Sequence, residues 1–106
     1  MINEDITKIK DTIINAVPVV KLFLFGSYAN GTQHGHSDYD FYIVVPNDGI
    51  RPIDAIGEAQ LAMRSMKVKP VDILAGTVDI FNRRSKQMTI ERKIAEEGFL
   101  IYEREQ

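Results

Sequence analysis

Two aspartates, Asp38 and Asp40, open an apolar run at residues 38–45 (DYDFYIVV). Alternation along a strand puts both carboxylates on one face, with Cα atoms roughly 6–7 Å apart, and puts Tyr39, Phe41, Ile43 and Val45 on the other face. Neighbouring carboxylates repel each other and raise each other's pKa, and a bridging divalent cation removes that conflict. Mg²⁺ suits such a place because it takes one or two carboxylates, water and phosphate oxygens. The other interpretation is a polar strand start with both side chains in water.

A third aspartate, Asp72, lies inside a second short apolar run at residues 70–74 (PVDIL). We expect this run to form a mostly buried strand, and a buried carboxylate needs a partner or a metal ion. If the two strands are neighbours, Asp72 joins Asp38 and Asp40 at one edge of the sheet, as a metal ligand or a general base. Alternatively, Asp72 caps a neighbouring backbone N–H group at the strand end.

A glycine–serine pair, Gly26 and Ser27, follows the apolar run at residues 19–25. Free backbone N–H groups and a hydroxyl at the end of a strand suit a phosphate. Taken alone, the pair is equally consistent with an ordinary turn.

The elements that position these residues follow from hydrophobic period and turn residues. We expect a helix over 3–17 capped by Asn3, a strand over 19–25, a loop over 26–37 that can contain a helical turn, a strand over 38–45, a helix over 52–66, a strand over 71–74, a helical stretch over 77–97 broken near Ser85, and a strand over 99–102. Met88 and Ile94 are expected among the apolar positions of the last helical stretch. This order predicts an α/β or α+β fold with helices packed on a sheet.

Composition narrows the class of protein. The chain has 106 residues with 13 basic and 15 acidic side chains, which fits one small domain spanning 1–106 and makes a nucleic-acid partner improbable. It has no cysteine, so disulfides, thiolate nucleophiles and cysteine-based zinc sites are excluded. No apolar run approaches the roughly 20 residues of a membrane span, and we expect a cytoplasmic protein.

Together, Gly26-Ser27, Asp38-x-Asp40 ten residues later, and an apolar-Asp72-apolar strand about thirty residues further on resemble the DNA polymerase beta-type nucleotidyltransferases. Within that superfamily the chain is most similar to the minimal nucleotidyltransferases, many of which act as antitoxins beside HEPN-domain toxins. The likeness is detailed from about Phe23 to Leu74, and the closing residues 97–102 (EGFLIY) also look like the family's usual end.

The resemblance implies a mixed four-stranded sheet flanked by helices, ATP or another nucleoside triphosphate as donor, and Mg²⁺, with two ions expected. Gly26 and Ser27 would hold the triphosphate. Asp38 and Asp40 would ligate the metal ions, and Asp72 would complete the metal site and help to deprotonate the acceptor hydroxyl.

One position departs from the family's pattern. Many members have an arginine soon after the glycine–serine pair, and here that position holds Asn30, which offers only an amide. Nucleotide affinity or turnover is therefore in doubt. Compensating charge could come from a basic residue elsewhere, although each is equally a candidate surface charge: Arg51, Arg83, Arg84 or Lys86.

Three functions remain open. The preferred one is AMP transfer to a hydroxyl that a partner protein presents, because four strands and their helices leave few residues to bind a large acceptor. The resemblance implies that this hydroxyl belongs to a tyrosine of a HEPN toxin, so that the chain would act as a type VII-like antitoxin. The second is an inactive antitoxin that neutralises its partner by binding alone. The third is transfer to a small molecule, which would need a homodimer. His34 and His36 have no third ligand at a defined spacing and are expected to be exposed.

Overall fold

The computed structural model describes residues 3–31 and 38–105, so His34 and His36 lie outside the described residues. The elements are α1 (Glu4–Ala16), β1 (Lys21–Phe25), α2 (Ser27–Asn30), β2 (Tyr39–Val45), α3 (Pro52–Ala62), β3 (Val71–Thr77), α4 (Val78–Arg84), α5 (Ile90–Glu97) and β4 (Phe99–Glu103). Within those residues, none of the helices has the length and apolar content needed to cross a bilayer.

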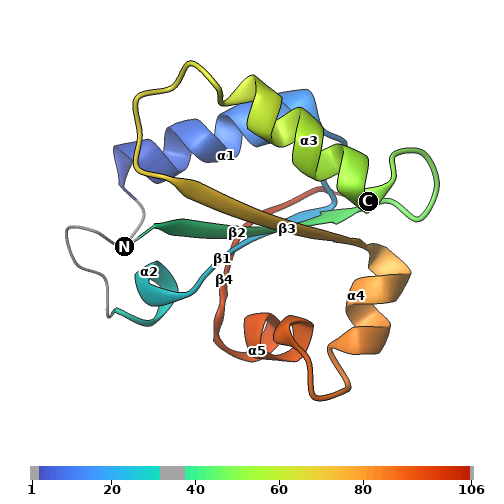
Figure 1. Cartoon of the computed structure of the whole chain (residues 1–106). Coiled ribbons are helices and arrows are strands. Elements are labelled where there is room, and N and C mark those ends of the chain that lie inside the picture. The colour runs from blue at the N-terminus through green and yellow to red at the C-terminus, as the bar shows by residue number, and fades with distance from the viewer. Residues whose placement is uncertain (1–2, 32–37, 106) are drawn as a thin grey trace.

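Four strands form one mixed sheet in the order β3-β2-β1-β4. Strand β1 pairs antiparallel with both β2 and β4, whereas β2 and β3 run parallel, joined through α3. Helices α1 and α3 cover one face of this sheet, and α4 and α5 lie on the other (Figure 1). The predicted α/β class and the four-stranded mixed sheet flanked by helices are therefore confirmed.

The first face of the sheet carries the larger core. Helix α1 begins where the Asn3 side chain accepts a hydrogen bond from the Ile6 N–H at 2.8 Å, as expected for an N-cap. Its isoleucines at helical spacing, Ile6, Ile9 and Ile13, are fully buried against the sheet. Strand β2 supplies the other side of this core from alternate positions 39, 41, 43 and 45.

The second face combines a smaller apolar cluster with a partly buried polar network between β2, α4 and α5. The Tyr42 hydroxyl donates to Oε2 of Glu91 at 3.0 Å, and Arg84 Nε donates to Oε1 of Glu91 at 2.9 Å. Burial alone would raise the pKa of Glu91, but the bonds from Arg84, its own backbone and Tyr42 outweigh burial and leave that pKa below its usual 4.5. The network fixes α5 over the sheet.

Several predicted boundaries and one core position are wrong. Strand β3 extends through Gly76 to Thr77, and α3 ends at Ala62 rather than near Met66. The helical turn considered within the loop after β1 is present as the short helix α2. Met88 is 95% exposed, because it lies in the turn between α4 and α5 and not on a helix face.

We predict that Glu91→Gln lowers the free energy of unfolding by about 1–3 kcal/mol near neutral pH, because it removes the charge that Arg84 and Tyr42 bind in a buried place. The depressed pKa makes Glu91 stabilising above pH 4.5, and this contribution is lost as the pH falls through the lowered pKa of the folded state. Urea denaturation at neutral and acidic pH measures both effects.

The matched control is Glu96→Gln. Glu96 pairs with Arg92 at 3.3 Å on an exposed part of the same helix, and we expect a loss of at most about 0.5 kcal/mol. Equal losses in the two variants would contradict a special role for Glu91.

Candidate functional site

Three neighbouring strands bring Phe25, Asp40 and Asp72 into one row across the sheet. Phe25 is the register partner of Asp40 in the antiparallel pair, and Asp40 is the partner of Asp72 in the parallel pair. Residues directly opposite one another share a face of the sheet. The expected adjacency of the two aspartate-bearing strands is therefore confirmed.

The row lies on the face that carries α4 and α5. Tyr42 and Val44, which alternate with the apolar residues of the larger core, pack in the second cluster with Phe81 and Ile94. Asp40 continues this alternating set at the start of β2, beyond the part that α4 covers. It is half-buried, which keeps its carboxylate accessible from that face.

Asp72 is exposed, which corrects the expectation of a buried strand. Strand β3 is the last strand on its side of the sheet, so one edge of it is open, and only Ile73 and Gly76 of its residues are buried. Parallel strands are usually covered on both faces, but α4 and α5 leave the start of β3 uncovered. The Asp72 carboxylate therefore faces solvent beside Asp40.

The carboxylates act on one another electrostatically. Burial, followed by the negative charges of Asp72 and Asp38, raises the pKa of the Asp40 carboxyl above its usual 3.8. Asp38 is half-buried and immediately precedes β2. Among residues 3–31 and 38–105, no ion pair neutralises any of the three.

Gly26 lies against Asp40 and has a conformation that other residues avoid. Its φ of 76° and ψ of −151° lie in a region essentially restricted to glycine. A Cβ there would collide with Oδ2 of Asp40 and lie 3.2 Å from Cγ. The absence of a side chain therefore lets the chain turn from β1 into α2 directly beside the carboxylate, with half-buried Ser27 as the first residue of α2.

The basic residues considered as substitutes for an arginine at position 30 do not converge here. Arg51 forms a bidentate pair with Asp54 at the start of α3, beyond the opposite end of β2, and Arg84 is bound to Glu91. Arg83 and Lys86 are exposed at the end of α4 and in the turn that follows it.

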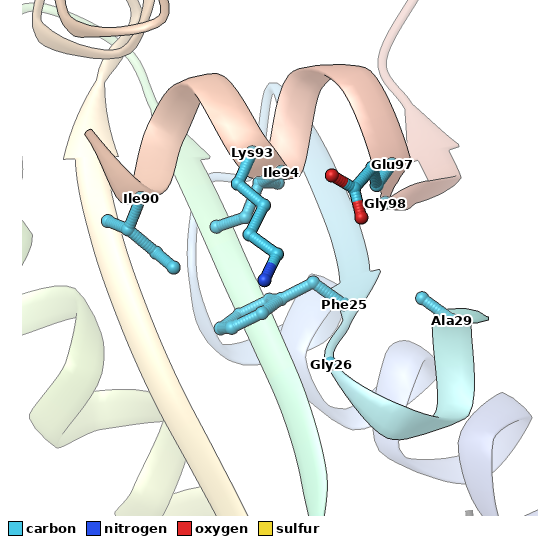
Figure 2. A pocket seen from close by; sticks show the side chains of 8 residues that line it. All are labelled: Phe25, Gly26, Ala29, Ile90, Lys93, Ile94, Glu97 and Gly98. Carbon is cyan, nitrogen blue, oxygen red and sulfur yellow. The ribbon is translucent and has the colours of Figure 1, made fainter. Parts of the chain in front are cut away.

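Sequence reasoning missed a pocket next to Gly26. It lies between the end of β1, α2 and α5, has a volume of about 180 Å³, and is lined in part by Phe25, Lys93 and Ile94 (Figure 2). The spacing of Ile90, Lys93, Ile94 and Glu97 is that of one helix face, but only the packing of α5 shows what this face meets.

A parallel strand carrying Asp72, an acidic start to β2 and a glycine turn at the end of β1 define a fold of the nucleotidyltransferase class. The family model described as polymerase beta, nucleotidyltransferase matches residues 7–106, and the chain belongs to this family. No curated protein matches the sequence significantly.

Solved structures extend the likeness. A mutant of the toxin–antitoxin MntA-HpeT is 25% identical, with a TM-score of 0.66 over 99% of this chain and 76% of that one. A second MntA-HpeT mutant is 20% identical, with a TM-score of 0.63 over 98% and 75%. A toxin–antitoxin with AMP-PNP is 19% identical, with a TM-score of 0.57 over 93% and 73%; these last two likenesses concern the fold.

We predict that Gly26→Ala lowers the free energy of unfolding by about 1–3 kcal/mol, because it combines an unfavourable backbone conformation with the collision at Asp40. Gly57→Ala is the control, since Gly57 lies in α3 with open space around its Cα. That change should raise the free energy of unfolding by about 0.5–1 kcal/mol. Thermal denaturation of both variants measures these changes. A Gly26→Ala variant more stable than the wild type would contradict the close contact between Gly26 and the Asp40 carboxylate.

The raised pKa of Asp40 predicts that removal of its charge increases the stability of the folded protein. Above that pKa the charged carboxylate costs stability, and the cost disappears as the pH falls through the raised pKa towards 3.8. We expect Asp40→Asn to raise the free energy of unfolding at neutral pH by roughly 0.2–1 kcal/mol, the usual size of a cross-strand pair effect. The difference should vanish below pH 3.8.

Urea denaturation over this pH range measures the effect of Asp40→Asn. The control, Asp48→Asn, changes an exposed carboxylate in the turn after β2 and should leave stability unchanged. A destabilised Asp40→Asn at neutral pH would contradict the repulsion.

Proposed function

We propose that this chain is a Mg²⁺-dependent nucleotidyltransferase that moves AMP from ATP to a hydroxyl of a partner toxin. The observation that carries the proposal is the row of Asp40 and Asp72 beside the Gly26 turn, in a chain of the polymerase beta nucleotidyltransferase family. The acceptor is a tyrosine of a HEPN-type toxin, which the transfer silences, so that the chain acts as a type VII-like antitoxin.

The donor set fits Mg²⁺. Two or three carboxylates that repel one another, with no cationic side chain paired to them in the described part of the chain, favour a bound cation. In those same residues no group of three acidic, histidine or cysteine side chains is close enough to hold a metal by itself. Two of these carboxylates would be enough, because Mg²⁺ usually takes only one or two carboxylates and completes its shell with water and substrate phosphates.

Each residue then has a distinct role. Gly26 and Ser27 hold the triphosphate of ATP through backbone N–H groups and the serine hydroxyl. Asp38 and Asp40 would hold the metal, which would supply charge neutralisation for the phosphate oxygens and the leaving group. Asp72 would help to hold the metal and would accept the proton of the acceptor hydroxyl.

The reaction is an in-line displacement. The acceptor oxygen forms a bond to the α-phosphorus, the bond from that phosphorus to the bridging oxygen of the β-phosphate breaks, and pyrophosphate leaves with the electron pair. The hydroxyl proton passes to Asp72 and from there to water. The products are an AMP-modified acceptor and pyrophosphate.

The exposure of Asp72 supports a macromolecular acceptor. Its strand lies at the open side of the sheet, so a hydroxyl on the surface of another protein can reach it without entering a deep cleft. The similar structures are of toxin–antitoxin pairs, one of them with the nucleotide AMP-PNP.

A second function, neutralisation of a toxin by binding alone, is favoured by one feature. Asn30 stands where many relatives have an arginine, and neither Arg51 nor Arg84 compensates, because each is engaged elsewhere. A chain that had lost catalysis would keep the fold and the binding surface.

We predict that the wild-type chain with ATP and Mg²⁺ adds one AMP to its partner toxin, observed as a mass increase of the intact toxin, and that chelation of Mg²⁺ prevents it. The double variant Asp38→Asn/Asp40→Asn should lower the rate at least about 100-fold, because charge stabilisation in the transition state is lost. The control Asp48→Asn should retain the wild-type rate.

Growth rescue in cells that express the toxin separates the two functions. If the double variant rescues growth as well as the wild type does, neutralisation occurs by binding, and the enzymatic account of neutralisation is wrong.

A further inference from the structure

The pocket beside Gly26 lies next to the row of carboxylates, because two of its lining residues neighbour Asp40. One of its walls is Gly26, whose Cα lies against the Asp40 carboxylate. Another is Phe25, the register partner of Asp40. A ligand group in this pocket is therefore adjacent to whatever is bound at Asp40.

The volume of about 180 Å³ is too small for a whole nucleotide, since pockets that enclose complete small ligands measure about 300–1,000 Å³. It suits one part of a nucleotide. The remainder of that molecule would extend past Gly26 towards Ser27 and Asp40.

The walls of the pocket are mainly apolar. Phe25 comes from β1, Ala29 from α2, and Ile90 and Ile94 from α5, so three elements enclose it (Figure 2). Phe25 is only partly buried against the second core, and Ile90 is 41% exposed. An aromatic side chain with aliphatic neighbours favours a flat, weakly polar group over a phosphate.

Two opposite charges border these apolar walls. Lys93 and Glu97 lie four residues apart on α5, and Figure 2 shows the Lys93 ammonium extending towards Phe25 and the Glu97 carboxylate beside the last turn of α5, near Gly98. Within the described residues neither side chain forms an ion pair. The pocket thus offers both a hydrogen-bond donor and an acceptor at its polar margin.

We propose that this pocket holds the nucleobase of the donor nucleotide, with Phe25 against the face of the base and with Lys93 and Glu97 at its edge. The proposal rests on the proposed function, because it assumes that the phosphates lie at Gly26, Ser27 and Asp40. Nucleobases combine a flat stacking surface with donors and acceptors on the edge, which is the combination that the pocket presents.

The test compares two probes in calorimetric titrations with Mg²⁺: ATP, and inorganic triphosphate, which has the phosphates but no base. We expect Phe25→Leu and Lys93→Ala each to weaken ATP binding about tenfold and to leave triphosphate binding unchanged. Asp40→Asn should weaken both probes. The control variants, Lys86→Ala and Glu58→Gln, change exposed charges away from the pocket and should weaken neither.

A second measurement does not depend on variants. With methyl-labelled isoleucine, ATP should shift the Ile90 and Ile94 resonances through the ring current of the base, whereas triphosphate should not. Ile53, exposed on α3 over the opposite face of the sheet, serves as the internal control.

The outcomes separate the two proposals. If Asp40→Asn abolishes ATP binding but the pocket variants do not weaken it, the nucleobase assignment is wrong and the proposed function stands. Equal weakening of both probes by Lys93→Ala would mean that the pocket holds phosphates, which also overturns the assignment. If the wild type binds neither probe, alone or with its partner toxin, both proposals fail.

Discussion

Strand β2 is the element on which the other parts of the structure depend. It is hydrogen-bonded on both sides, antiparallel to β1 and parallel to β3, and from Phe41 to Val45 it is buried on both faces. A strand that is enclosed in this way has a fixed register, because a slip of one residue would exchange its two faces. The fixed register places Asp40 opposite both Phe25 and Asp72, so the packing of the apolar end of β2 sets the geometry of its acidic end.

The acidic end has an electrostatic cost that the apolar end compensates. Burial and two neighbouring carboxylates raise the pKa of Asp40, and among the described residues no cationic side chain offsets them. Functional sites commonly reduce the stability of the folded protein. Here the buried apolar side chains of both cores offset the electrostatic cost of the carboxylates. The proposed function would account for this cost, because a bound cation would neutralise the repulsion between the carboxylates.

Local sequence signals predicted the structure correctly where the hydrophobic periodicity within a single element determines it. The Asn3 cap, the isoleucine face of α1 and the alternation along β2 are local features, and each is confirmed. The Gly26 turn was expected as well, although its contact with Asp40 depends on how β1 and β2 pair. Asp72 was wrongly predicted to be buried, because an apolar run in the sequence does not distinguish a central strand from an edge strand. The pocket could not be predicted, because α5 is placed by the Tyr42–Glu91–Arg84 network, whose members are distant along the chain.

The pairing of β1 with β4 has a consequence for how the protein is made. Lys21 pairs with Glu103, 82 residues later, and α5 immediately precedes β4. Contacts between such distant segments form late, because closing a long stretch of chain costs entropy before the contact repays it. During synthesis on the ribosome, β1, β2 and β3 can associate while α5 and β4 have not yet emerged. The row of Phe25, Asp40 and Asp72 can therefore assemble first, and the pocket beside it is enclosed only when the last strand is added.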